Sequence, residues 1–193
     1  MSQITKRAMA SALKQLLETK PLSKITIADI TESCGINRMT FYYHFQDIYD
    51  LIDWICLDEG ERAVGENRGV STWQEGFLNL CRAVLQNRAF IENVYRSVKR
   101  EQIESFLYRV TEDLLGPVVD EEAQGKGLTE EERRCIVDFY KFAFVGTALN
   151  WVKTGMKQTP EELTHTLSIL LEGQFAHAIE NFRHAGDPSK QEK

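Results

Sequence analysis

The sequence predicts an all-α protein, with a small N-terminal helix-turn-helix domain and a larger C-terminal helical bundle. Apolar residues recur at helical spacing along most of the 193 residues, and no stretch alternates as a half-buried strand does. Residues 25–45 have the length and pattern of two short helices around a glycine-containing turn. We expect a helix-turn-helix domain at 1–46, a regulatory and dimerisation domain at 47–185, and a disordered tail at 186–193.

The first three helices follow from local signals. Apolar residues predict a helix over 3–19. Thr26 suits the N-cap of the second helix, because Asp29 stands three residues on, where a carboxylate can return a bond to the cap. Gly35 supplies the left-handed residue that a helix end needs, and Asn37 is a good cap for the third helix.

The remaining chain is expected to form further helices over 46–65, from Ser71 through about residue 85, and over 88–97, 101–115, 129–154 and 160–184. Capping-box patterns open three of them, at Ser71 with Gln74, Thr129 with Glu132, and Thr159 with Glu162. Gly116-Pro117 is expected to break the pattern, and residues 120–127 read as a mobile acidic loop.

Charge is distributed unevenly between the two parts. The whole chain carries a net charge of −6, but residues 1–46 hold six basic and three acidic groups, a net charge of +3. The rest of the chain therefore carries −9. An attractive field for polyanions is confined to the N-terminal end, and the acidic remainder disfavours contact with phosphates elsewhere.

The third helix has the chemistry of a DNA-reading helix. Phe41 and Phe45 share one face and should pack inward, which leaves Arg38, Tyr42 and their neighbours outside. Arginine can bond guanine through two donors, and tyrosine, histidine and helix N-termini can bind phosphate. Half-buried packing in an ordinary bundle is the alternative for any one of these rings. The candidate DNA-binding residues are Lys6, Lys24, Thr26, Asn37, Arg38, Met39, Thr40, Tyr42, Tyr43 and His44.

Three motifs, I-T-I-x-D-I at 25–30, G-I-N-R at 35–38 and T-F-Y-Y-H-F at 40–45, resemble the DNA-binding domain of the TetR/AcrR family of bacterial transcriptional regulators. The resemblance covers about residues 4–56. It implies an all-α homodimer in which Thr26 and exposed residues of the third helix contact DNA. Many relatives carry a phosphate-binding lysine where this chain has Ile48. YYHFQD followed by YDLIDWI resembles the branch that regulates dihydroxyacetone kinase operons.

Two late helices predict a dimer. The helix over 129–154 is apolar on nearly every side, and in a chain this small its own core covers only part of it. Pairing across a two-fold axis with a second copy would cover the rest, and two heads could then reach successive major grooves. The alternative is that both helices serve only the monomer core. The expected interface residues are Phe139, Ala143, Gly146, Thr147, Asn150, Leu167, Leu171, Phe175 and Ile179.

Aromatic residues of the middle helices suggest a cavity for an effector. Such a cavity would be apolar with a few hydroxyl groups, and its candidate lining is Trp73, Phe77, Tyr95, Phe106 and Tyr140. The alternative is that these rings simply fill the core. The sequence does not distinguish a small-molecule effector from a protein partner.

Several function classes find no support. The sequence holds no nucleophile elbow, phosphate loop, zinc spacing or dinucleotide fingerprint, so we expect no enzyme, no cofactor and no metal site. The four cysteines are widely spaced and fit buried, reduced thiols. No apolar run is long enough to cross a membrane, and we expect a cytoplasmic protein.

The sequence therefore predicts a transcriptional regulator that binds a palindromic operator in double-stranded DNA and responds to an effector or partner through its C-terminal domain. Repression is the family default, and activation is an alternative because the suspected branch contains activators. A helical adaptor that acts through a protein partner without binding DNA is the other hypothesis.

Overall fold

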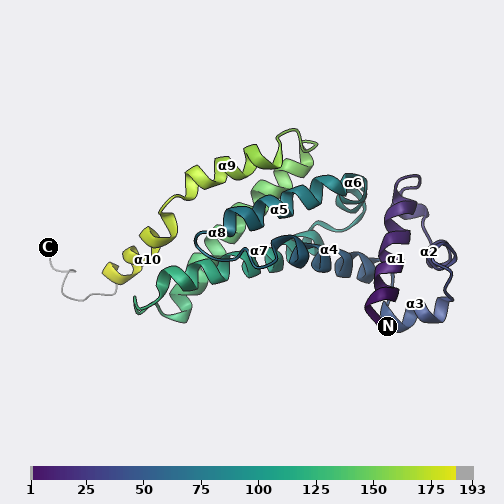
Figure 1. The fold of residues 1–193 in the computed structure, drawn as a ribbon, viewed down its shortest axis with the longest axis horizontal. Coiled ribbons are helices and arrows are strands. Elements are labelled where there is room, and N and C mark those ends of the chain that lie inside the picture. Colours follow the sequence, from purple (N-terminus) through teal and green to yellow (C-terminus); the bar gives the residue numbers. More distant parts are fainter. Residues whose placement is uncertain (1, 186–193) are drawn as a thin grey trace.

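The computed structural model describes residues 2–185, all of whose regular elements are helices. The tail expected at 186–193 lies outside the described residues. The molecule is elongated, with the first three helices forming a head at one end and the last helix at the other (Figure 1). The elements are α1 (Ser2–Leu17), η1 (Leu22–Lys24), α2 (Ile27–Ser33), α3 (Arg38–His44), α4 (Ile48–Val64), α5 (Trp73–Gln86), α6 (Arg88–Ser97), α7 (Arg100–Ala123), α8 (Glu130–Lys153), α9 (Pro160–Leu171) and α10 (Gln174–Ala185).

The local signals in the head are confirmed. The Thr26 hydroxyl accepts the backbone N–H of Asp29, whose carboxylate in turn accepts the backbone N–H of Thr26 at 2.8 Å. Gly35 follows with φ +68°, a conformation that a side chain at this position would strain. Asn37 then caps α3. These three signals set the lengths of α2 and α3 and the turn between them.

The core of the head is completed by the helices that follow it. Phe41 and Ile30 are fully buried, and they share one apolar cluster with Leu51 and Ile55 of α4. Phe90 of α6 belongs to the same cluster. The head is thus packed directly on the body, and α4 runs from one into the other (Figure 1).

The body has an aromatic core between α5, α8 and α10. The ring of Trp73 lies 5.7 Å from that of Phe144 and 6.4 Å from that of Phe175, both edge-on. Phe77 meets Phe144 at 5.1 Å. Edge-to-face pairs of this kind add about 0.5–1.5 kcal/mol each beyond their buried area. Helices α7 and α8 make the most extensive contact between two helices in the described part of the chain.

The break expected at Gly116-Pro117 is wrong, because α7 continues through Pro117 to Ala123. A proline inside a helix costs about 3 kcal/mol. Here the ring faces solvent, whereas Leu114, Leu115, Val118 and Val119 on the other side are almost completely buried. Burial of this continuous apolar face outweighs the missing hydrogen bond. The loop expected at 120–127 is correspondingly reduced to the turn after Ala123.

The single last helix expected over 160–184 is also wrong. It is divided at Gly173, which has φ +69°, into α9 and α10. The apolar pattern runs through the break, but α9 packs on α5 whereas α10 packs on α7 and α8. The change of direction lets both segments bury their apolar faces. The capping boxes at Thr129 and Thr159 are confirmed.

The capping box expected at Ser71 is a third difference. The helix begins at Trp73, and Thr72 stands at its cap without a side-chain bond to the helix. The Thr72 hydroxyl instead accepts the backbone N–H of Gly69 at 3.0 Å. The neighbouring amide of Val70 donates to the Glu121 carboxylate of α7 at 2.8 Å. The loop is therefore held by α7, and the N-cap of the helix moves one residue along, from Ser71 to Thr72.

Candidate nucleic-acid interface

Helix α3 presents large apolar and aromatic side chains to solvent. Met39, Tyr42 and Tyr43 are 76%, 55% and 82% exposed, whereas Phe41 on the opposite face is completely buried. Phe45 is buried beside it, with ring centroids 5.9 Å apart. The inner face therefore fixes the helix, and the outer face is left for a partner. Exposed aromatic residues gathered on one short helix mark an interaction surface.

A shallow hollow open to solvent lies on this outer face. It is bordered by Asn37, Met39, Thr40, Tyr42 and Tyr43. Arg38 is exposed at the first position of the helix, where Asn37 caps it. No aspartate or glutamate occurs from residue 33 to residue 46. The surface thus combines a cation, hydroxyl donors and apolar atoms without a carboxylate, which suits the edges of bases and their phosphates.

His44 lies at the end of α3 and is half-buried. Its ring is edge-on to that of Tyr43, with centroids 4.9 Å apart. Within residues 2–185, no three His, Cys, Asp or Glu side chains come together as a metal site would require. His44 therefore packs against Tyr43 at the end of the helix.

Thr26 begins α2 at the flank of this surface, and both of its donors are engaged. Its hydroxyl donates to the Asp29 carboxylate at 2.7 Å, and its N–H donates to the same group. These bonds, with one from Lys20 at 3.3 Å, lower the pKa of Asp29 to about 2. An ionised carboxylate therefore stands at the helix start for which a phosphate contact was expected.

The basic residues of the head have unequal surroundings. The Lys6 ammonium lies over the rings of Phe45 and Trp54, 5.3 and 5.5 Å from their centroids. Lys24 is exposed at the end of η1. Ile48, in the position where many relatives of the expected family carry lysine, is half-buried against the core of the head. Lys6 thus has a packing role in addition to any contact with a phosphate.

The body presents a second apolar surface along α8. Phe139 and Phe142 are 70% and 56% exposed, and Ala143, Gly146 and Asn150 continue the same exposed face. A side chain added at Gly146 would meet nothing within 4 Å. We name the exposed residues Phe139, Phe142, Ala143, Gly146 and Asn150 the α8 face.

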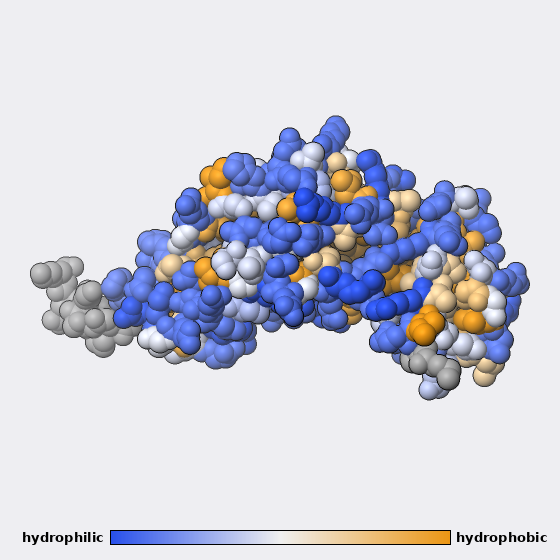
Figure 2. Space-filling model, viewed as in Figure 1, coloured by the Kyte–Doolittle hydropathy of each residue, from blue (hydrophilic) through white to orange (hydrophobic). Residues whose placement is uncertain are grey.

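Other residues expected at the dimer interface lie elsewhere. Leu167, Phe175 and Ile179 are buried in the chain's own core, whereas Leu171 and Thr147 are half-buried. Two neighbouring side chains of α9 are exposed: Leu170, which belongs to the apolar pattern expected to pair with a second copy, at 63%, and Ile169, which the sequence did not single out, at 62%. Figure 2 shows an apolar patch over this end of α9. Because the sequence was interpreted as one continuous helix through Gly173, the exposure of this end of α9 was not predicted.

A cavity of about 120 Å³ lies between α4, α5, α6, α7 and α8. Phe77, Tyr95 and Phe106 line it, as expected. Trp73 and Tyr140 do not: both pack around Phe175, and the Tyr140 hydroxyl donates to the Gln174 carbonyl at 3.1 Å. That position leaves Tyr140 buried, which raises the pKa of its hydroxyl.

Helix α4 supplies a wall of the cavity that the sequence did not reveal, including Asp53, Cys56 and Glu59. Their positions on α4 carry no pattern that separates a cavity wall from an ordinary core face. Cys81 of α5 faces the same cavity, and burial raises the pKa of both thiols to about 12. The two thiols are therefore protonated at neutral pH and behave as small apolar groups.

Two family models match the chain. Residues 9–54 match the N-terminal model of the bacterial regulatory proteins of the tetR family, and residues 71–173 match the C-terminal region model of TetR transcriptional regulators. The chain belongs to the TetR family. The first match spans α2, α3 and the turn between them, and the second covers the cavity-bearing bundle from α5 to α9.

Among curated relatives, the chain is 30% identical over 118 residues to the HTH-type dhaKLM operon transcriptional activator DhaS of Lactococcus lactis subsp. lactis (strain IL1403). That alignment covers 61% of this chain and 62% of the relative, less than two thirds of its length. The resemblance to regulators of dihydroxyacetone kinase operons is confirmed by this match.

No helix within residues 2–185 is long and apolar enough to cross a membrane.

Solved structures of TetR-family regulators share the fold. A structure of the dihydroxyacetone kinase operon activator DhaS aligns with a TM-score of 0.66 at 22% identity, over 94% of this chain and 97% of that one. A TetR regulator from Streptococcus agalactiae 2603V gives 0.56 at 22% identity, over 89% and 95%. The repressor AlkX from Dietzia sp. strain DQ12-45-1b gives 0.57 at 16% identity, over 90% and 96%.

Proposed function

We propose that this TetR-family regulator binds a palindromic operator as a homodimer and controls transcription of a neighbouring operon. The observation that carries the proposal is the outer face of α3, where Arg38 and the strongly exposed Met39, Tyr42 and Tyr43 stand on a helix that holds no carboxylate. We also propose that the protein acts in the cytoplasm, where a DNA-binding regulator meets its operator.

The roles follow from the position of each side chain on α3. Arg38 suits a guanine edge, because its planar guanidinium can donate two parallel hydrogen bonds to O6 and N7. Tyr42 and Tyr43 suit phosphate oxygens on either side of the groove. Met39 and the Thr40 methyl supply apolar contact, for example with thymine. Lys24, and Lys6 beside its aromatic contacts, add salt-sensitive attraction to the backbone.

A homodimer is supported by the α8 face. Two aromatic rings more than half exposed on one helix leave apolar area in water, and pairing with a second copy removes it. Glycine and alanine beside them allow the two helices to approach closely. The dimer then sets the spacing of the two heads, which must reach major grooves roughly 34–36 Å apart. The DNA-binding domain in this proposal is residues 1–46, and the regulatory and dimerisation domain is residues 47–185.

We favour activation of the operon over repression. The support is the identity with DhaS, whose name describes an operon activator. The cavity between α4 and α8 offers an effector site, and an effector that prefers one spacing of the heads would shift DNA affinity. Repression, and an adaptor that does not bind DNA, remain the competing outcomes of the experiments below.

The test is retention of genomic DNA fragments by the full chain at several salt concentrations. A regulator retains specific fragments, and its log affinity falls with log salt by about 0.9 for each phosphate contacted. Arg38→Ala should lower affinity and relax preference at one base pair, by about 1–3 kcal/mol. Tyr42→Ala should weaken all sites alike.

Arg96→Ala is the matched control, because this arginine is strongly exposed on the body and its ion pair within residues 2–185 is with Glu92 of its own helix. It should bind DNA as the parent does. A flat response to salt would favour the adaptor. Parent-like binding by both Arg38→Ala and Tyr42→Ala would contradict the assignment of α3 as the reading helix.

A further inference from the structure

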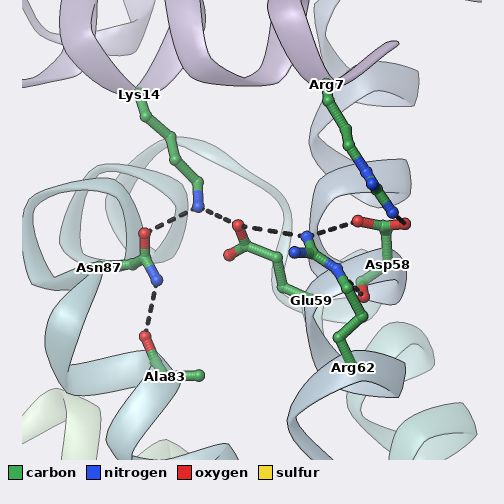
Figure 3. Close-up of polar contacts among 7 residues, drawn as sticks. All are labelled: Arg7, Lys14, Asp58, Glu59, Arg62, Ala83 and Asn87. Carbon is green, nitrogen blue, oxygen red and sulfur yellow. Dashed lines mark hydrogen bonds and ion pairs between the residues drawn. The ribbon is translucent and has the colours of Figure 1, made fainter. Parts of the chain in front are cut away.

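One ammonium group joins the head to two elements of the body. Lys14 of α1 donates to the Glu59 carboxylate of α4 and, at 2.7 Å, to the side-chain oxygen of Asn87 between α5 and α6 (Figure 3). Asn87 is held in turn, because its amide donates to the Ala83 carbonyl at 2.8 Å. The ammonium also lies 5.5 Å from the centroid of the Phe90 ring. Lys14 therefore adds polar contacts from α1 to α4 and to the turn between α5 and α6, beside the apolar cluster that packs α1 on these helices.

A second link beside it is weaker. Asp58 pairs with Arg62 of its own helix at 2.5 Å, and Arg7 of α1 approaches the same carboxylate at 3.8 Å (Figure 3). The Arg7 side chain is 57% exposed, so this contact contributes little. The Lys14 and Glu59 side chains are only 21% and 28% exposed. Glu59 thus makes the less exposed of the two ion pairs between α1 and α4, beside the apolar cluster that packs α1 on the body.

Glu59 and Asn87 also line the cavity between α4 and α8. The charged residues that line it are Asp53 and Glu59, and no lysine, arginine or histidine is among the lining residues within 2–185. The Asp53 carboxylate has no hydrogen bond or ion pair in the described chain, and burial raises its pKa although Arg109 acts in the opposite direction. Glu59 is paired with Lys14 and lies 3.9 Å from Arg62, whereas Asp53 has no such partner, so this otherwise apolar cavity favours a cation over an anion.

The size of the cavity limits what it accepts without change. Its volume of about 120 Å³ is somewhat below the roughly 150 Å³ of an engineered apolar cavity that binds benzene. A ligand with a single aromatic ring is therefore close to the largest that the cavity accepts in this conformation. A larger ligand must move α4, α5 or the turn at Asn87, which are the elements that hold Lys14.

We propose that the cavity binds an apolar molecule that carries a cationic amine, and that this amine competes with Lys14 for Glu59. Two ammonium groups at one carboxylate repel each other, so each weakens the binding of the other. Filling the cavity then releases α1, and through it the head. The inference rests on the proposed function, because it names the effector class and the path by which the effector would act on DNA binding.

The first experiment measures ligand binding by calorimetry with the full chain and without DNA. The probes are 2-phenylethylamine, the neutral 2-phenylethanol and the anion 3-phenylpropanoate, which share one ring and a short chain. The amine should bind about tenfold more tightly than the alcohol, because a hydrogen bond to a charged group is stronger, and the anion should bind least. Equal binding of amine and anion, or no binding of the amine, overturns the proposal.

Two matched variants test the role of Glu59. Glu59→Gln should remove the preference for amine over alcohol, whereas Glu61→Gln, an exposed position of α4 outside the cavity, should leave it unchanged. Circular dichroism confirms that each variant is folded. If Asp53→Asn removes the preference and Glu59→Gln leaves it intact, the competition with Lys14 is excluded.

The competition itself is tested by Lys14→Met, with Lys14→Gln as a second variant in case the first is unstable. Both remove the Lys14 ammonium and leave Glu59 with its longer contact to Arg62 at 3.9 Å, so both should bind the amine several-fold more tightly while binding the alcohol as the parent does. An amine affinity that stays the same or falls overturns the proposal. Because none of these titrations contains DNA, a protein that failed to retain DNA would contradict the proposed function and leave the cavity result standing.

Discussion

The side-chain oxygen of Asn37 accepts hydrogen bonds from the backbone N–H of Thr40 at 2.8 Å and from its hydroxyl at 3.0 Å. The same asparagine borders the hollow on the outer face of α3. One residue thus begins the helix and stands at its contact surface. Its two roles can be separated by substitution.

Asn37→Ala removes the cap and should lower the free energy of unfolding by about 1 kcal/mol, with a loss of DNA affinity as α3 frays. Asn37→Asp keeps the cap, so its stability should equal that of the parent, but its carboxylate faces phosphates and DNA binding should fall further. Asn37→Ser serves as the control that retains a cap without charge. Denaturant unfolding and DNA titration measure the two effects. Parent-like DNA affinity in Asn37→Asp would place this residue away from the duplex.

Lys6 is expected to act in both packing and DNA attraction. Lys6→Met keeps the apolar stem and removes the charge over Phe45 and Trp54, which should cost about 0.5–1 kcal/mol of stability. The slope of log affinity against log salt should also become shallower by about 0.9. Lys24→Met, at an exposed position, should change the slope without changing stability. An unchanged slope in Lys6→Met would assign this lysine to packing alone.

Phe139→Glu is expected to weaken the dimer. Burial of a phenylalanine side chain contributes roughly 1.5–3 kcal/mol, so its replacement by a charge should raise the dissociation constant of the dimer at least about tenfold. Sedimentation velocity over a range of protein concentrations measures the change. Ile4→Glu is the matched control, because this residue is 76% exposed on α1, far from the α8 face. A dimer that persists unchanged in Phe139→Glu would show that the chains pair through another surface.

The cavity thiols should resist alkylation. With pKa values of about 12, Cys56 and Cys81 are almost entirely protonated at pH 8, so iodoacetamide should modify them only after unfolding. Their folded-state pKa lies above the ordinary value near 9. The stability that they contribute is therefore complete below about pH 9 and is lost as pH rises towards 12.

Mass spectrometry of individual cysteines measures the alkylation, and unfolding curves at pH 8 and pH 10.5 measure the loss of stability. Cys81→Val, of similar volume, should lose less stability over this interval than the parent does. Rapid alkylation of Cys56 in the folded protein at pH 8 would mean that the wall of the cavity opens far more often than its packing indicates.

The sequence was most informative where neighbouring residues decide the structure. Thr26, Gly35 and Asn37 set the ends of α2 and α3 through bonds that span three or four positions, so the shape and outer face of α3 could be predicted. The continuity of α7 and the break at Gly173 depend on which distant helix each face meets. Local propensity pointed to a break in α7, and the apolar pattern pointed to a continuous helix through Gly173. The cavity wall of α4 could not be predicted for the same reason.

The left-handed Gly173 lets α9 lie along α5 while α10 turns to α7 and α8. A chain cut after Leu171 would therefore leave Trp73 and Tyr140 without the Phe175 ring that covers them. Proteases that shorten the protein from this side would turn a folded regulator into one with a bare aromatic surface, prone to aggregate and be degraded. We therefore expect the lifetime of the folded regulator to depend on the integrity of its last helix.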